Sequence, residues 1–233
     1  MEVLLNGARI EIELIGGAPL GEGFYGRAAR DSLDALPLVG RDSGIIHPEK
    51  IGRNRTVRGK SVAVFGSSEP AQGEPLYEEA RAVGSLLARA GFLVVNGGYG
   101  GVMEGASRGA REAGGRCVGV TVDAFSRGRG NPFLSEERRE PDLFLRTRRL
   151  IELSDAYIIL RGKSGTLAEL MFLWALDRGG LLPSTRIVLL GGFWEEILAS
   201  LTSLQMVESE QMKITRMART PEQAVEQVSA FFR

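Results

Sequence analysis

The sequence has little cysteine and histidine, which excludes several kinds of chemical site. Its 233 residues contain one cysteine, Cys117, and one histidine, His47. A single cysteine forms no intramolecular disulfide and no cysteine-rich zinc site, and a single histidine excludes a metal site built on a histidine pair. Cys117 lies in an apolar stretch, so we predict a packed core residue rather than a nucleophile. We expect no metal site.

The sequence also lacks an excess of charge of either sign and a long apolar run. The 29 basic and 29 acidic residues cancel, whereas nucleic-acid-binding domains usually carry a basic excess. A membrane-spanning helix needs about 20 consecutive apolar residues, and the sequence contains no such run. The N-terminus has no basic-then-apolar signal segment. We therefore expect a cytoplasmic protein that binds neither nucleic acid nor a membrane.

The first 59 residues differ in pattern from the rest. Val3–Leu5 is followed by Asn6-Gly7 and then by alternating apolar and acidic residues up to Leu14, a pattern typical of a β-hairpin with a tight turn. Residues 16–60 are rich in glycine, proline and charge. They predict an irregular arm that either wraps the fold or covers a site. We place the N-terminal hairpin and arm in residues 1–59, and a Rossmann-like nucleotide-binding domain in residues 60–233.

Short apolar segments alternate with helical patterns from Ser61 onward. Continuous apolar strands between helices predict an α/β fold: a Rossmann-like, doubly wound parallel sheet with helices on both faces. Residues 123–141 are predicted to form a polar loop. The expected strands are 62–65, 92–95, 117–122, 142–145, 157–160, 187–190 and 214–217.

Three glycine-containing loops follow these strands and carry the candidate ligand site. They are Gly66–Ser68, Gly97–Gly101 and Gly162–Thr166. Right-handed crossovers place them on one edge of the sheet, and we expect each to lead into a helix, whose N-terminal N–H groups favour phosphate. None has the spacing of a Walker loop, and the first strand is not followed by a dinucleotide-binding pattern. The sequence therefore predicts a site for the phosphate of a small nucleotide-like ligand.

Two groups of polar and charged residues have both a structural and a functional interpretation. Thr166 and Glu169 have the spacing of a capping box, in which Thr166 caps the helix and Glu169 reaches back; alternatively, Glu169 is a carboxylate beside the ligand. Arg146, Arg148 and Arg149 either form a solvated helix face or include a residue that binds phosphate in a bidentate manner.

These motifs resemble the "lonely guy" family, long mislabelled lysine decarboxylase, over roughly Lys60–Leu190. Val64–Ser68 is similar to the first-strand motif, Asn96–Met103 to the second glycine loop, and Arg161–Glu169 matches the signature Pro-Gly-Gly-x-Gly-Thr-x-x-Glu in spacing. Arg146 falls where the family has its active-site arginine. Characterised members are cytokinin riboside 5′-monophosphate phosphoribohydrolases, and members commonly form dimers.

The chain departs from this pattern at two positions. Arg161 stands where the family has proline, and Lys163 where it has the second glycine; Lys163 either adds charge to the phosphate site or fills it. The loop after Asn96 is nearer to a second branch, which includes nucleotide-binding proteins of unknown activity and a molybdenum-cofactor carrier. The old decarboxylase label is poorly supported, because pyridoxal phosphate needs a Schiff-base lysine and Lys163 is the only lysine near the proposed site. We expect no cofactor.

The resemblance implies an N-glycosidase that releases base and ribose 5-phosphate from a nucleoside 5′-monophosphate. The alternatives are a non-catalytic carrier or sensor of a nucleotide or molybdenum cofactor, and a partner-binding protein with a vestigial pocket. We expect a homodimer. The catalytic candidates are Arg146 and Glu169, and the candidates for nucleotide and phosphate binding are Gly66, Ser67, Ser68, Gly98, Tyr99, Gly100, Gly101, Met103, Gly162, Lys163, Ser164, Gly165 and Thr166.

Overall fold

The computed structural model describes residues 2–5, 8–11, 59–123, 129–182 and 185–233. The chain divides into two compact units, Met1–Ile45 and Ile46–Arg233. In the first unit, strands β1 (Glu2–Leu5) and β2 (Ala8–Glu11) pair in antiparallel fashion, which confirms the expected hairpin. The turn at Asn6-Gly7, the end of the expected hairpin at residues 12–14 and residues 16–58 of the expected arm lie outside the described residues. The boundary after residue 59 stays a prediction.

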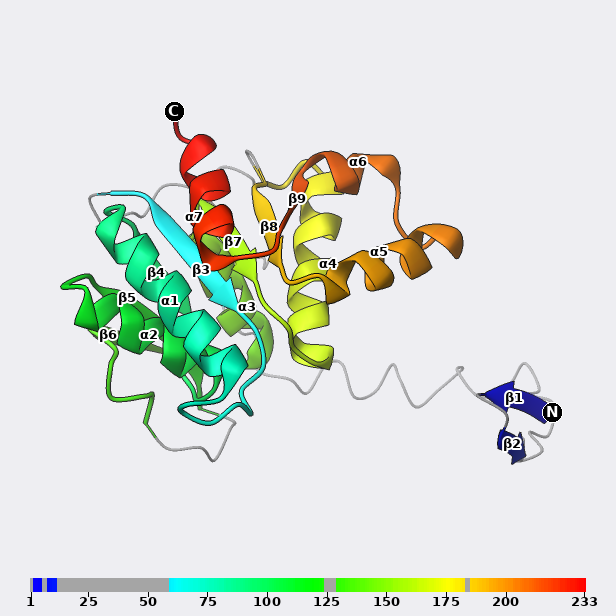
Figure 1. Cartoon of the computed structure of the whole chain (residues 1–233), viewed down its shortest axis with the longest axis horizontal. Helices are drawn as coiled ribbons and strands as arrows, with labels where there is room; N and C mark the ends of the chain where they lie inside the picture. Colours follow the sequence, from blue (N-terminus) through cyan, green and yellow to red (C-terminus); the bar gives the residue numbers. More distant parts are fainter. Residues whose placement is uncertain (1, 6–7, 12–58, 124–128, 183–184) are drawn as a thin grey trace, which may run out of the picture. The chain divides into compact units, whose positions relative to one another are not determined.

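A parallel sheet forms the centre of the second unit (Figure 1). Its strands within the described residues are β3 (Ser61–Phe65), β4 (Leu93–Asn96), β5 (Cys117–Val122), β6 (Glu136–Glu140), β7 (Ala156–Ile159), β8 (Ile187–Leu190) and β9 (Thr215–Ala218). They lie in the order β6-β5-β4-β3-β7-β8-β9, and each pairs in parallel with its neighbours. The predicted α/β fold is confirmed.

Helices cover both faces of this sheet, as a doubly wound fold requires. They are α1 (Pro75–Arg89), α2 (Val102–Glu112), α3 (Leu143–Glu152), α4 (Ser164–Arg178), α5 (Phe193–Ser203), α6 (Ser209–Lys213) and α7 (Pro221–Ala230). Helices α1, α2 and α7 pack against one face, and α3, α4 and α5 pack against the other.

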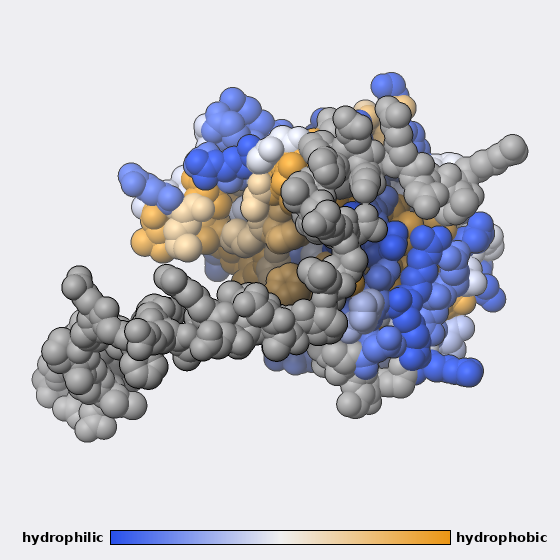
Figure 2. Space-filling view, turned by 180° about the vertical axis from the view of Figure 1, so that it is seen from behind, coloured by the Kyte–Doolittle hydropathy of each residue, from blue (hydrophilic) through white to orange (hydrophobic). Residues whose placement is uncertain are grey.

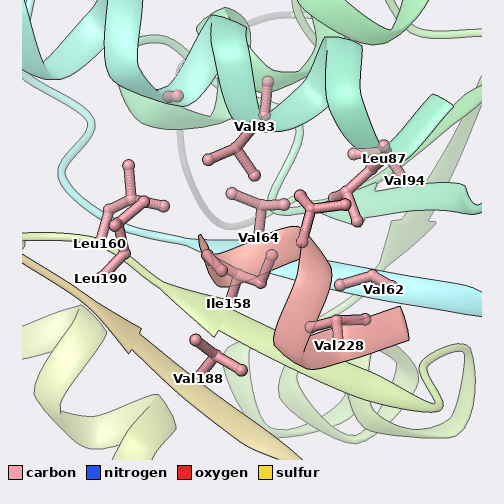
Figure 3. Close-up of a cluster of buried hydrophobic side chains, with 14 of the residues drawn as sticks. Val62, Val64, Val83, Leu87, Val94, Ile158, Leu160, Val188, Leu190 and Val228 are labelled. Atoms are coloured by element: carbon pink, nitrogen blue, oxygen red, sulfur yellow. The ribbon is translucent and has the colours of Figure 1, made fainter. Parts of the chain in front are cut away.

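The strands are apolar on both sides because both faces are buried. Val62 and Val64 of β3 point toward α1 and α7, together with Ile158 and Val188 (Figure 3). The intervening residues of β3, Ala63 and Phe65, belong to the cluster on the opposite face. Cys117 is fully buried in the first cluster, and burial raises the pKa of its thiol to about 12. Its predicted role in the core is therefore confirmed.

The strand order creates a switch point in the middle of the sheet. From β3 the chain moves outward through β4, β5 and β6, and it then returns to add β7 on the other side of β3. The loops that follow β3 and β7 therefore start side by side at the carboxyl edge and lead to helices on opposite faces of the sheet. Ligands of doubly wound sheets bind at this kind of position.

Two of the expected elements around residue 140 are wrong. Glu136–Glu140 forms edge strand β6 inside the expected polar loop, and its charged side chains are tolerated because the edge faces water. The segment expected as a strand at 142–145 is instead the start of α3. Asp142 caps this helix, since its carboxylate accepts a hydrogen bond from the N–H of Leu145 at 2.8 Å.

No helix in the described ranges combines the length and the apolar character that crossing a membrane requires.

Candidate functional site

A cavity of about 370 Å³ opens at the carboxyl edge of the sheet, at the switch point. The loops after β3, β4 and β7 contribute to its wall, and so do the first turns of α2, α3 and α4. Its lining residues are Phe65, Gly66, Ser67, Ser68, Glu69, Gly97, Tyr99, Met103, Leu143, Arg146, Lys163, Ser164, Gly165, Thr166 and Glu169. Eleven of the fifteen sequence-derived candidates are among them.

Backbone hydrogen bonds tie the three loops together. The N–H of Ser67 donates to the carbonyl of Arg161 at 3.0 Å, and the carbonyl of Ser67 accepts from the N–H of Val102 at 2.8 Å. Gly101 makes this approach possible, because it has a φ of +67° and an added Cβ would lie 2.3 Å from the Ser67 oxygen. The first N–H of α2 is thus used within the protein, which reduces what this helix offers to an anion.

The Gly66–Ser68 loop does not lead directly into a helix, contrary to expectation. Helix α1 begins only at Pro75. The loop instead bridges the other two glycine loops through Ser67. It therefore shapes one wall of the cavity without contributing a helix terminus.

Helix α4 directs its N-terminus at the cavity. Its first turn is Ser164-Gly165-Thr166, and the first N–H groups of a helix lack partners within that helix. All three residues line the cavity. Gly162 lets the loop approach this turn closely, since an added Cβ would lie 2.0 Å from Thr166 Oγ1. Three N–H groups and the positive end of the helix dipole suit a phosphate.

The capping-box interpretation of Thr166 and Glu169 is wrong. Helix α4 begins at Ser164 and its N-cap is Lys163, so Thr166 occupies the third helical position. Thr166 is buried, and Glu169 lines the cavity. Glu169 stays a candidate for the carboxylate beside the ligand.

Arg146 lies buried against the same cavity and faces Glu169. Its Nη1 is 3.7 Å from Glu169 Oε1, and its Nε donates to the carbonyl of Val120 at 2.8 Å. The guanidinium also lies over the ring of Tyr99, 5.8 Å from the ring centre. An added Cβ at Gly97 would lie 1.8 Å from Nη2, so only glycine leaves room for the arginine there.

The carboxyl of Glu169 has an unusual affinity for a proton. Burial raises its pKa from the ordinary value of 4.5 to about 7, and the nearby Arg146 opposes this rise. Burial disfavours the charged form of a carboxyl, while an adjacent cation favours it. A group with a pKa near neutrality can both accept and donate a proton at physiological pH.

Two asparagine side chains position the second glycine loop, and the sequence analysis missed their role. Asn96 is fully buried; its Oδ1 accepts from the N–H of Gly98 at 2.8 Å, and its Nδ2 donates to the carbonyl of Met103 at 3.0 Å. Asn131 Nδ2 donates to the carbonyl of Tyr99 at 3.0 Å. The sequence signal that could have indicated this role is the place of Asn96, a polar residue at the end of an apolar strand.

Tyr99 is fixed at both its ring and its hydroxyl. The hydroxyl accepts a hydrogen bond from the N–H of Val122 at 2.9 Å, and Arg146 lies over the ring. A base in the cavity could contact only the part of the Tyr99 ring that the guanidinium leaves accessible.

Lys163 lies at the rim and does not fill the cavity. Its Nζ forms an ion pair with Glu69 at 2.7 Å, and its side chain is 73% exposed. Arg161 lies over the ring of Phe193 at 5.6 Å. The two departures from the family signature therefore leave the N-terminus of α4 accessible.

Some candidates lie outside the cavity lining. Arg148 pairs with Glu152, and Arg149 pairs with both Glu140 and Glu152, so these two arginines form a charged helix surface. Four candidate glycines shape the loops without lining the cavity: Gly98, Gly100, Gly101 and Gly162. Met103 does line the cavity. Lining residues that the sequence analysis did not select are Phe65, Glu69, Gly97 and Leu143.

A family model describes most of the second unit. The SLOG cluster4 model matches residues 59–225. The chain belongs to the SLOG cluster4 family. This confirms the resemblance to lonely guy proteins that the glycine loops indicated. The described residues contain no group of three or more histidine, cysteine, aspartate or glutamate side chains that could hold a metal ion.

Curated relatives of this SLOG cluster4 protein match over about half of its length. An uncharacterized protein of Archaeoglobus fulgidus is 34% identical over 126 residues, which are 54% of this chain and 79% of that protein. A cytokinin riboside 5′-monophosphate phosphoribohydrolase of Rhodococcoides fascians is 33% identical over 113 residues, 47% of this chain and 57% of the relative.

Solved structures share the fold of this SLOG cluster4 protein. The molybdenum cofactor binding protein of Rippkaea orientalis superposes with a TM-score of 0.61 at 22% identity, over 76% of this chain and 100% of that chain. The likeness to this structure establishes the common Rossmann-like architecture.

Proposed function

We propose that this protein is a nucleoside 5′-monophosphate phosphoribohydrolase, which releases base and ribose 5-phosphate. The observation that carries the proposal is the meeting of two features in one cavity. The N-terminus of α4 presents the N–H groups of Ser164–Thr166, and a buried carboxyl with a pKa of about 7, Glu169, lies in the next turn. The first suits a phosphate, and the second suits a proton transfer.

Glu169 is the general base in this mechanism. Cleavage of an N-glycosidic bond passes through an oxocarbenium-like transition state, which a nearby carboxylate stabilises. The bond between C1′ and the base nitrogen breaks with its electron pair leaving on the base. Water bonds to C1′ and its proton passes to Glu169. Glu169 then gives a proton to the departing base, which regenerates the carboxylate.

Arg146 positions and tunes Glu169. The guanidinium is fixed to the carbonyl of Val120 and lies 3.7 Å from the carboxyl. Its charge favours the ionised form of Glu169 that accepts a proton. Gly66, Ser67 and Ser68 form the wall that faces the N-terminus of α4 and would enclose the phosphate. The relative from Rhodococcoides fascians, named as a phosphoribohydrolase, supports this assignment.

A carrier is the second candidate function. The structure from Rippkaea orientalis is named as a molybdenum cofactor binding protein, and the same cavity would hold the phosphate of such a ligand. The two ion pairs that line the cavity, Lys163–Glu69 and Arg146–Glu169, are compatible with binding without turnover. A carrier would bind a nucleotide-like ligand and hydrolyse nothing.

A homodimer is part of the proposal. Apolar surface is visible beside hydrophilic surface on the face that Figure 2 shows. Leu143, Phe144 and Leu145 at the start of α3, and Phe172 on α4, are large apolar side chains exposed to solvent. A second copy of the chain would bury them next to the cavity. We propose a cytoplasmic location on the same footing, from the sequence.

The deciding experiment measures the release of free base from a panel of nucleoside 5′-monophosphates. Adenylate and N6-substituted adenylates are incubated with the wild type and with Glu169→Gln, and products are separated by chromatography. We expect release by the wild type and a loss of at least about a hundredfold in kcat in the variant, the usual scale for a general base. Ligand binding, followed by thermal shift, is expected to persist in the variant.

Two outcomes would contradict the enzyme assignment. Unchanged turnover in Glu169→Gln would exclude the role of this carboxyl. Clear stabilisation by nucleotides without base release from any of them would support the carrier instead. Glu226→Gln, which alters an exposed carboxyl on α7, is the matched control and is expected to keep full activity.

A further inference from the structure

The charged side chains that line the cavity neutralise one another. Among the lining residues described, four carry a charge: Glu69, Arg146, Lys163 and Glu169. They form two ion pairs, Lys163–Glu69 at 2.7 Å and Arg146–Glu169 at 3.7 Å. With both carboxyls ionised, these four side chains add no net charge. In this doubly ionised state, a phosphate dianion gains an uncompensated cation in the lining only when one pair opens.

The two pairs differ greatly in exposure, and this decides which one opens. The side chains of Lys163 and Glu69 are 73% and 63% exposed, whereas those of Arg146 and Glu169 are 9% and 16% exposed. An exposed ion pair contributes little to stability, because water solvates both charges when they separate. Separating a buried pair leaves a charge without compensation in a region of low polarity. The exposed pair is the one that opens.

Lys163 is placed to deliver its charge to the N-terminus of α4. It is the N-cap residue of that helix, so its backbone directly precedes the N–H groups of Ser164–Thr166. Its ammonium is a compact point charge on a flexible four-carbon stem, and the side chain lines the same cavity. Glu69 belongs to the facing loop after β3.

We propose that Lys163 is a phosphate-binding residue whose charge is held by Glu69 until the ligand's phosphate displaces this carboxylate. Glu69 is then a competitor that sets the affinity and selects for ligands of high negative charge. The inference rests on the proposed function in one respect, namely that the ligand carries a phosphate. It holds equally for a substrate that is hydrolysed and for a ligand that is only carried.

The test is a double-mutant cycle on binding, measured by calorimetry with inorganic phosphate, adenylate and adenosine. The proteins are the wild type, Lys163→Ala, Glu69→Gln and the double variant. Lys163→Ala is expected to weaken phosphate and adenylate binding by at least about tenfold, the scale of a charge-assisted hydrogen bond. Glu69→Gln is expected to strengthen it about two- to fivefold, the scale of an exposed ion pair. Adenosine binding should not change.

The double variant separates the exchange from simple repulsion. If Glu69 acts by holding Lys163, its removal gains nothing once Lys163 is alanine. A gain that persists undiminished in the double variant would show repulsion alone and overturn the proposal. Lys213→Ala is the matched control, because Lys213 is also 73% exposed and pairs with Glu210 on α6; this variant should bind phosphate like the wild type.

Other outcomes would also overturn the inference. Unchanged phosphate affinity in Lys163→Ala, weaker binding in Glu69→Gln, or a wild type that binds no phosphate would each do so. Base release is measured on the same samples. If the binding changes occur as expected but no base is released, the inference stands and the phosphoribohydrolase assignment fails. If base is released but the affinities are unchanged in the variants, the assignment stands and the inference fails.

Discussion

Arg146 reaches across from α3 to Glu169 on α4, with Nη1 3.7 Å from Oε1, while its Nε is held by the carbonyl of Val120 on β5. The arginine therefore links a strand and two helices at the cavity. Its charge does not fully compensate the burial of the carboxyl, since the pKa of Glu169 is raised to about 7. The protonation of this one carboxyl therefore affects the stability of the fold and, in the proposed mechanism, the chemistry of the cavity.

Stability should fall as pH rises from about 4.5 to 7. The raised pKa of Glu169 means that the folded state keeps a proton that the unfolded chain loses above its ordinary pKa of 4.5. The free energy of unfolding then decreases through this interval, by roughly 3 kcal/mol for this group, and stays level above pH 7. Urea unfolding at a series of pH values measures it.

Glu169→Gln should remove this contribution from the pH dependence, because the amide does not titrate. Glu226→Gln changes an exposed carboxyl on α7 and should leave the dependence intact. An equal slope in Glu169→Gln and the wild type would show that another group is responsible.

The activity profile should shift when Arg146 is replaced. If ionised Glu169 is the base, turnover rises with pH through about 7. Arg146→Ala removes the cation that lowers the pKa of Glu169, so the rise should move to higher pH, and Arg146→Lys should restore part of the shift. Arg148→Ala, on the same helix but paired with Glu152, should keep the wild-type profile. A profile unmoved by Arg146→Ala would contradict the coupling.

The sequence predicts the parallel sheet and places Glu169 at its carboxyl edge, because apolar strands and glycine loops are local signals. Arg146 is expected at the same edge after a strand at 142–145; that strand is wrong, and Arg146 reaches the cavity from α3. Edge strand β6 could not be predicted in this way, because every residue of Glu136–Glu140 is charged. The segment is a strand only because β5 pairs with it. The capping-box spacing of Thr166 was ambiguous for a related reason. The first residue of α4 depends on the backbone conformation of Lys163 and Ser164 after β7, and the spacing of Thr166 and Glu169 does not determine that conformation.

The pairing of Lys163 with Glu69 could not be predicted either. These residues are far apart in the chain, and each alone is an ordinary exposed charge. Only the switch point, which places the loops after β3 and β7 side by side, brings them together. Long-range proximity at a sheet edge is a property of topology rather than of local pattern.

Gly101→Ala should destabilise the protein more than another glycine with positive φ. At Gly101, φ is +67° and an added Cβ would lie 2.3 Å from the carbonyl oxygen of Ser67. At Gly91, φ is +82° and the added Cβ meets no described atom within 4 Å. Gly91→Ala should therefore cost only the backbone strain, about 1 kcal/mol, and Gly101→Ala about 1–3 kcal/mol more.

Thermal unfolding of the two variants measures this difference. The comparison bears on the close approach between the glycine loops, because both variants place a side chain at a positive φ and only Gly101→Ala meets a neighbouring backbone. Equal losses of stability would mean that the loop after β3 moves aside without cost, and that the hydrogen bond from Val102 to Ser67 does not fix the cavity wall.

Phe144→Asp should weaken the proposed homodimer. Phe144 is 84% exposed, next to Leu143, which both lines the cavity and is 50% exposed. A charge at this position cannot be buried against a second copy without a large desolvation penalty. Light scattering after size-exclusion chromatography, over a range of concentrations, should show a dimer for the wild type and a monomer for the variant. Leu204→Asp, at a residue that is 69% exposed beyond α5, is the control and should stay dimeric. A wild type that is monomeric throughout would contradict the proposed homodimer. A dimer that Leu204→Asp disrupts and Phe144→Asp does not would place the interface away from the cavity. In either case Arg146 would act within its own chain.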